Sequence, residues 1–169
     1  MGLFGPPNVA KLDNAGKIAE LVKAANYKKD PAVREAARVS LAGMLDKIIQ
    51  RLQTKNVVEL EAARDALVII GEPARDRLIF ILREGHVHRR QDAAFVLGMM
   101  GDPEAVKALT MAMHNPDPLL RLLCVQALAK IGDPAGMDVV RQALGDTDTQ
   151  VAAAARKALK QHGMLPSAG

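Results

Sequence analysis

The chain carries the segments Gly71-Glu72-Pro73-Ala74, Gly101-Asp102-Pro103-Glu104 and Gly132-Asp133-Pro134-Ala135, which begin 30 and 31 residues apart. Each segment follows a run of apolar residues at helical spacing. A fixed period of this length is typical of proteins in which helix pairs stack on their neighbours. The sequence therefore predicts an all-α fold, a right-handed α-α superhelix or α-solenoid.

The composition agrees with this prediction. Of the 169 residues, 49% are hydrophobic and only 2% are aromatic, so Ala and Leu supply most of the apolar content. No long alternating run predicts a strand. The single Cys excludes an internal disulfide and fits a reducing compartment. Because we find neither a signal peptide nor an apolar run of membrane-spanning length, we expect a cytoplasmic protein without a membrane partner.

Pairs of an acidic or amide residue followed by Pro predict the starts of five helices. The side chain of the first residue accepts hydrogen bonds from free backbone N–H groups, and Pro lacks an N–H where none is needed. The pairs are Asp30-Pro31, Glu72-Pro73, Asp102-Pro103, Asn115-Pro116 and Asp133-Pro134. The preceding helices are predicted to end at Gly16, Gly71, Gly101, Gly132 and Gly163.

These signals divide the chain into helix pairs. The N-terminal segment 1–15 would contain a short capping helix, and a flexible tail would follow at 164–169. The five predicted repeats cover about 16–44, 45–70, 71–100, 101–131 and 132–163. Their second helices align on Leu41, Leu67, Leu97, Leu128 and Leu159. The second repeat is shorter than the others, which predicts a local change of curvature there.

The second helices carry variants of the pattern Val-Arg-x-x-Ala-Ala-x-x-x-Leu, with Gly-Asp-Pro after the third and fourth copies. The first copy reads Val33-Arg34-Glu35-Ala36-Ala37, with one residue between Arg and the two Ala. This pattern resembles HEAT repeats of the short kind found in phycobilisome-lyase-like proteins, over about residues 16–163. The resemblance implies an α-solenoid whose second helices line the concave side. It names no activity, because the repeat is a packing unit.

The resemblance also implies a structural ladder of paired charges along the stack. Its members are the arginine after the Val position and the acidic residue after the Gly. Because a half-buried arginine needs a carboxylate partner, we interpret these residues as structural. They are Arg34, Arg90 and Arg121 on one side and Asp46, Glu72, Asp102 and Asp133 on the other.

The resemblance places four positions of each second helix in the concave groove, and large apolar residues occupy several of them. Our hypothesis is that a non-catalytic adaptor or scaffold binds a partner protein there. The alternative is that curvature buries these residues. The apolar patch consists of Ile69, Phe95, Met99, Leu122 and Leu123. Its polar rim consists of Glu35, Glu61, Asp65, Gln91, Asp92, Gln126, Lys130 and Lys157.

Two further functions are weighed against protein binding. A nucleic-acid-binding protein would use a basic edge, although the groove offers no Trp or Tyr to stack a base and the net charge is only +4. The candidate anion-binding edge consists of Arg75, Arg77, Arg83, Arg89 and Arg90, which a solvated surface also explains. A bilin lyase-like or bilin-handling factor is a minor alternative that rests on the resemblance alone.

The sequence indicates no catalytic or metal-binding cluster. His86 and His88 stand two residues apart, so they do not share a helix face, and a third strong ligand is not evident. Deoxyhypusine hydroxylases, another group of HEAT proteins, hold iron with His-Glu pairs, and here no His is followed by Glu. Cys124 is interpreted as a packing residue. We expect no cofactor, no metal and no enzymatic activity.

Overall fold

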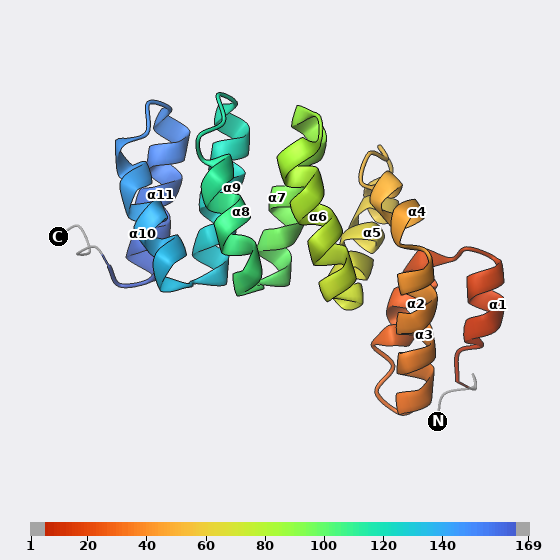
Figure 1. Cartoon of the computed structure of the whole chain (residues 1–169). Helices are drawn as coiled ribbons and strands as arrows, with labels where there is room; N and C mark the ends of the chain where they lie inside the picture. Colours follow the sequence, from red (N-terminus) through yellow and green to blue (C-terminus); the bar gives the residue numbers. More distant parts are fainter. Residues whose placement is uncertain (1–5, 165–169) are drawn as a thin grey trace. The chain divides into compact units, whose positions relative to one another are not determined.

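The computed structural model describes residues 6–164, which form eleven α-helices and two short 3-10 turns (Figure 1). This part of the chain contains no strand. The predicted all-α solenoid fold is therefore confirmed. The chain divides into two compact units, Met1–Ala74 and Arg75–Gly169. The boundary lies just after the predicted second repeat.

The first unit contains a short helix followed by four longer ones. These are α1 (Val9–Asn14), α2 (Ile18–Ala25), α3 (Pro31–Gly43), α4 (Leu45–Arg51) and α5 (Val57–Ile70). The short α1 packs against α2 and α3, α2 also contacts α5, and α4 packs against α5. The helix expected in segment 1–15 is thus α1, and residues 1–5 lie outside the described part.

The second unit stacks three helix pairs in two layers. Its elements are α6 (Glu72–Glu84, beginning just before the boundary), α7 (Val87–Met100), η1 (Pro103–Ala105), α8 (Val106–Ala112), α9 (Pro118–Ile131), α10 (Pro134–Gln142), η2 (Ala143–Gly145) and α11 (Thr149–Gln161). One layer holds α7, α9 and α11, and the other holds α6, α8 and α10 (Figure 1). Within the first of these layers, α9 packs against both α7 and α11. The loops inside the three pairs lie along the same edge of the second unit, at the top in Figure 1.

The aligned leucines form the interior of each unit. Leu41 and Leu67 in the first unit, and Leu97, Leu128 and Leu159 in the second, are all 0% exposed. Burial of one such side chain stabilises the fold by about 2 kcal/mol. No polar or charged side chain is buried among residues 6–164. The core is therefore entirely apolar, as the repeat pattern predicts.

Two of the predicted N-cap residues are wrong. The N-cap of α9 is Asp117, whose carboxylate accepts hydrogen bonds from the backbone N–H groups of Leu119 and Leu120 at 3.2 and 3.1 Å. Asn115 instead accepts from the backbone N–H of Asp117 at 3.0 Å and orders the loop. Glu72 is the first residue of α6 rather than the residue before it. The caps at Asp30, Asp102 and Asp133 are as predicted.

Candidate functional site

The surface of α7, α9 and α11, here named the second-helix face, carries most of the apolar patch. Phe95 is 37% exposed, and Met99, Leu122 and Leu123 are half-buried. The rim residues Gln126, Lys130 and Lys157 are exposed, and Gln91 and Asp92 are half-buried. These apolar side chains are therefore accessible to a partner and are not fully buried in the core.

The remaining predicted positions lie in the first unit. Ile69 is half-buried on α5. Glu35, Glu61 and Asp65 are exposed, and Glu61 forms an ion pair with Arg64 at 2.7 Å. The structure thus divides the predicted residues between the two units.

A cleft of about 120 Å³ opens between α7 and α9 on the second-helix face. Its walls combine apolar side chains with two polar ones at the edge. The lining residues are Phe95, Gly98, Met99, Leu123, Gln126, Ala127 and Lys130. Three of the five predicted patch residues meet here, whereas Leu122 lies outside the lining.

The floor of this cleft is a close approach of two helix backbones. Gly98 is buried in the last turn of α7, and a Cβ atom placed on it would lie 2.8 Å from Cα and 2.9 Å from Cβ of Ala127 on α9. Real Cβ atoms do not come this close to a neighbour, so this position requires glycine. Sequence analysis did not single out Gly98, although an isolated glycine inside a helical run was a signal for it.

A second cleft, of about 420 Å³, lies between α9 and α11 and is more polar. Its walls carry two amides, two lysines and a histidine. The lining residues are Gln126, Ala129, Lys130, Ala154, Lys157, Ala158, Gln161 and His162. Gln126 and Lys130 line both clefts, so the two clefts adjoin at α9.

The outer face of α11 differs from the corresponding face of α9. Aligned on Leu128 and Leu159, buried Val125 corresponds to exposed Arg156, and Ala129 corresponds to exposed Lys160. Polar residues on the outer face are typical of a terminal repeat. The α11 side of the second-helix face is therefore bordered by cations.

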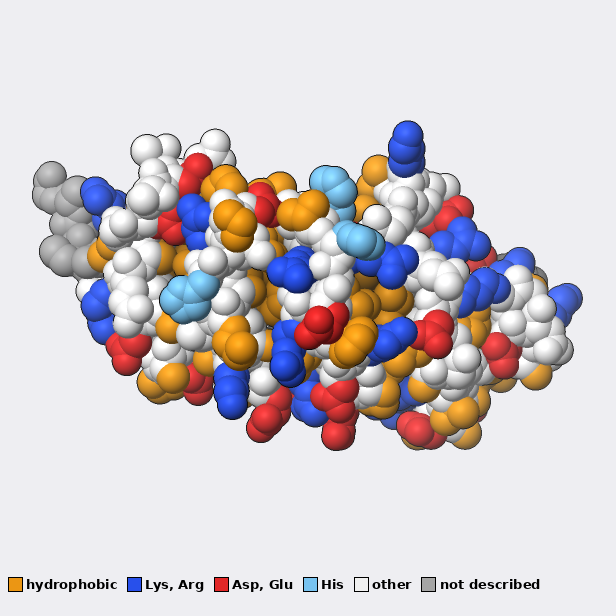
Figure 2. Space-filling view, turned by 45° about the horizontal axis from the view of Figure 1, so that its top comes forward, with side chains coloured by type: hydrophobic (Ala, Val, Ile, Leu, Met, Phe, Trp, Pro, Cys, Tyr) orange, Lys and Arg blue, Asp and Glu red, His pale blue; other side chains and the backbone are white. Residues whose placement is uncertain are grey.

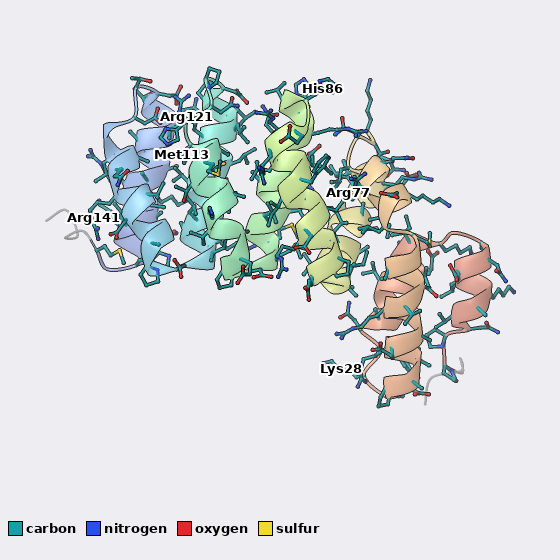
Figure 3. All side chains as sticks on the ribbon, in the orientation of Figure 1. Lys28, Arg77, His86, Met113, Arg121 and Arg141 are labelled. Carbon is teal, nitrogen blue, oxygen red and sulfur yellow. The ribbon has the colours of Figure 1, made fainter. Side chains whose placement is uncertain are left out.

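The charge ladder exists in a form that differs from the predicted one. Arg121 donates from Nε and Nη2 to the two carboxylate oxygens of Asp146, at 2.9 and 2.8 Å. Arg121 also donates to the backbone oxygens of Asn115 and Pro116. It lies at the end of α9 near the α10–α11 loop (Figure 3). The carboxylate partner of Arg121 is thus in the loop between α10 and α11. The Gly145-Asp146 pair in the sequence could have indicated this partner.

The other ladder arginines hold backbone carbonyls. Arg34 donates to the carbonyl oxygen of Tyr27 at 3.1 Å, and Arg90 donates to that of Gly85 at 2.7 Å. Together with Arg121, they show that the arginine of this pattern ties the loop inside its own helix pair. Among the predicted acidic members, Asp102 does form an ion pair, but with Arg75 at 2.8 Å, and Asp133 caps α10.

The two half-buried ion pairs shift the pKa values of their carboxyl groups. Hydrogen bonds from Arg121 hold the pKa of Asp146 below its usual range, and Arg75 does the same for the pKa of Asp102. The pKa of each arginine is raised in turn. Both pairs are thus fully charged at neutral pH and serve the fold.

The candidate anion-binding edge is partly occupied by contacts within the protein. Arg75 binds Asp76 and Asp102, Arg90 binds a loop carbonyl, and Arg77 on α6 (Figure 3) lies 5.5 Å from the centre of the Phe80 ring. Arg77, Arg83 and Arg89 are exposed, whereas Arg75 and Arg90 are half-buried. Figure 2 shows Lys and Arg interspersed with acidic and apolar side chains on the face that it presents.

The described residues contain no group of three or more His, Cys, Asp or Glu side chains arranged to hold a metal ion. His162 contacts the carbonyl oxygen of Ala129 at 2.8 Å, and His88 lies 3.4 Å from the side-chain oxygen of Gln91. No helix in residues 6–164 has the length and apolar character needed to cross a membrane.

Cys124 is 0% exposed on α9, and burial raises the pKa of its thiol to about 12. Since the thiolate is the reactive form, we expect native protein at pH 8 to resist alkylation. Labelling with iodoacetamide across a urea gradient, followed by mass measurement, should show modification only as the second unit unfolds. Rapid labelling without denaturant would contradict the buried position.

Comparisons with known proteins agree with this architecture. A structure of human deoxyhypusine hydroxylase in complex with glycerol aligns with a TM-score of 0.56 at 19% identity, over 92% of this chain and 76% of that chain. A designed armadillo repeat protein in complex with the peptide (KR)4 aligns with a TM-score of 0.51 at 16% identity, over 92% of this chain and 86% of that one. Identities this low show the fold alone. No curated protein sequence matches the chain.

The sequence profile described as HEAT repeats matches residues 75–160, about half of the chain. The matched range covers the second unit from α6 to the last turn of α11. The repeat architecture, the alignment of buried leucines and this match lead to one conclusion. The chain belongs to the HEAT-repeat family.

Proposed function

We propose that this protein is a non-catalytic scaffold that binds a partner protein on the second-helix face of its second unit. The observation that carries the proposal is the cleft between α7 and α9, in which Phe95, Met99 and Leu123 remain accessible. Accessible apolar groups bordered by polar side chains are typical of binding surfaces. The designed armadillo protein, which is similar in fold, is in complex with a peptide, and this supports the class of partner.

Burial of the cleft side chains would supply the binding energy. Phe95 is the largest of them, and large apolar groups in pockets contribute most to binding at protein interfaces. The cleft is also backed by the close packing of Gly98 against Ala127, which fixes the separation of α7 and α9. A rigid cleft loses little conformational freedom on binding.

The other functions receive less support. Nucleic acid would need a free basic surface, and three of the five edge arginines are engaged within the protein. A bilin ligand would need a site for a large tetrapyrrole, and the apolar cleft of about 120 Å³ is small for it.

A comparison of two variants tests the proposal. Phe95→Asp/Leu123→Asp places two charges in the cleft, and we expect it to lose the partners that wild type retains in affinity capture from native lysate. Burying the charges would cost several kcal/mol, so the loss should exceed tenfold.

The matched control is Phe80→Asp/Met111→Asp. It adds the same charges at apolar residues that are 55% and 56% exposed on α6 and α8. Circular dichroism must show that both variants remain helical. If both variants retain the same partners, or lose the same ones, the second-helix face is not the binding surface.

A further inference from the structure

The second-helix face changes from apolar to cationic along the stack. Alignment on the buried leucines makes Phe95, Gln126 and Lys157 equivalent on successive helices, and Met99 is likewise equivalent to Lys130. The α7–α9 cleft is therefore mainly apolar, with Gln126 and Lys130 of α9 as its polar members, whereas both lysines line the α9–α11 cleft. A ligand lying across the three helices would meet these two surfaces in order.

The cationic end is free to bind. Lys130 and Lys157 are exposed, and neither forms an ion pair within residues 6–164. Gln126 and Gln161 supply amide donors beside them. Arg156 and Lys160 on the adjacent surface of α11 add positive charge and are also exposed. This end would attract carboxylates and repel a basic peptide.

From this charge distribution we infer that the partner is an extended peptide segment that carries a bulky apolar residue and, a few positions away, one or more carboxylates. The inference rests on the proposed function and specifies its partner class. The apolar residue enters the α7–α9 cleft, and the carboxylates lie over Lys130 and Lys157. Packed helices are about 8–10 Å apart, and an extended chain advances about 3.3 Å per residue, so about three positions separate the two anchors.

This chemistry is opposite to that of the peptide bound by the designed armadillo protein, which is in complex with the basic peptide (KR)4. Because charge complementarity mainly sets specificity and association rate, the sign of the surface selects between such partners. The lysines of this chain thus favour acidic segments over basic ones.

The test uses synthetic fluorescein-labelled peptides on a Ser/Gly background and fluorescence anisotropy. The first peptide carries Phe and, three residues later, two Glu. The second carries the same residues in reverse order. The third is the first peptide with both Glu replaced by Lys, and the fourth is the first peptide with Phe replaced by Ser. We expect one of the two acidic peptides to bind at least about tenfold more tightly than the Lys peptide, and its affinity to fall with added salt.

Charge reversal provides the decisive variant. Lys130→Glu/Lys157→Glu should invert the preference, so that the Lys peptide binds more tightly than the Glu peptides. Arg83→Glu/Arg89→Glu is the matched control, because it changes the net charge equally at two exposed residues away from both clefts on the second-helix face. It should keep the wild-type preference.

The outcomes separate the inference from the proposed function. If Glu and Lys peptides bind equally and Phe95→Asp weakens both, the face binds peptides but the inferred charge preference is wrong. If the arginine control also inverts the preference, net charge alone explains it and the inference fails. If no peptide binds up to about 1 mM, the inferred partner class is wrong, and the lysate comparison still judges the proposed function. Binding that Phe95→Asp leaves unchanged would contradict both.

Discussion

Replacing Gly98 by Ala is expected to lower the free energy of unfolding of the second unit by about 1–2 kcal/mol. At a solvent-exposed helix position the same change would stabilise the protein by up to about 1 kcal/mol, because Ala is the better helix former. Here the new Cβ would lie 2.8 Å from the backbone of Ala127, so α7 and α9 would have to separate. Overpacking of this kind costs about 1–3 kcal/mol and should outweigh the gain in propensity.

Gly43 provides the matched control for this substitution. It is the last residue of α3, and a Cβ atom placed on it would have no neighbour within 4 Å. Gly43→Ala should therefore raise stability slightly, whereas Gly98→Ala lowers it. Urea unfolding followed by circular dichroism measures both. If Gly98→Ala is as favourable as Gly43→Ala, the two helices are less closely packed than the structure shows.

The Gly98→Ala variant also has a consequence for binding. Because Gly98 and Ala127 form the floor of the apolar cleft, separation of α7 and α9 should change the cleft as well. Ala127→Gly added to Gly98→Ala removes one of the two close contacts and should restore part of the lost stability. A double-mutant cycle measures this coupling.

Removal of Arg121 is the second prediction with a large expected effect. Arg121→Ala loses the two hydrogen bonds to Asp146 and those to the carbonyls of Asn115 and Pro116. It leaves the carboxylate of Asp146 half-buried without its partner. We expect the free energy of unfolding to fall by about 2–3 kcal/mol, since hydrogen bonds to charged groups contribute more than neutral ones.

Arg141→Ala is the control for this effect. Arg141 forms an ion pair with Asp138 at 2.5 Å, but the two side chains are 54% and 65% exposed. An exposed pair contributes less than about 1 kcal/mol. If Arg121→Ala and Arg141→Ala lowered the unfolding free energy equally, the bonds between α9 and the α10–α11 loop would not be important for stability.

Acid should remove the contribution of the Arg121–Asp146 pair. The pKa of Asp146 is lower in the folded protein than in the unfolded chain, where it is about 3.9. The stabilisation is therefore fully present above that value and is lost as the pH falls through the folded pKa. The difference in unfolding free energy between wild type and Asp146→Asn should shrink accordingly below pH about 4.

The fold could be predicted from the sequence because its determinants are local and repeated. Helix ends, buried leucines and Asp-Pro caps recur with a fixed period, and each reports on its own segment. Where two signals overlap, as in Asn115-Pro116-Asp117-Pro118, the local pattern does not decide which residue caps α9. That choice depends on which carboxylate or amide the N–H groups of Leu119 and Leu120 reach.

The site was predicted less completely, because its geometry depends on contacts between helices. The accessible Phe95, Met99 and Leu123 were identified from the resemblance to short HEAT repeats, which places their positions in the groove. The role of Gly98 depends on Ala127 of the next repeat, and the partner of Arg121 is 25 residues away in a different loop. A single sequence does not reveal such distant pairs.

The scarcity of aromatic and sulfhydryl groups gives this chain an intrinsic probe for each of its two units. Tyr27, the only Tyr in a sequence without Trp, lies in the first unit, and Cys124, the only Cys, lies in the second. Tyrosine fluorescence therefore follows one half of the protein while thiol protection follows the other. A single denaturation series, without any engineered label, reads out whether the two halves melt as one cooperative block or one after the other.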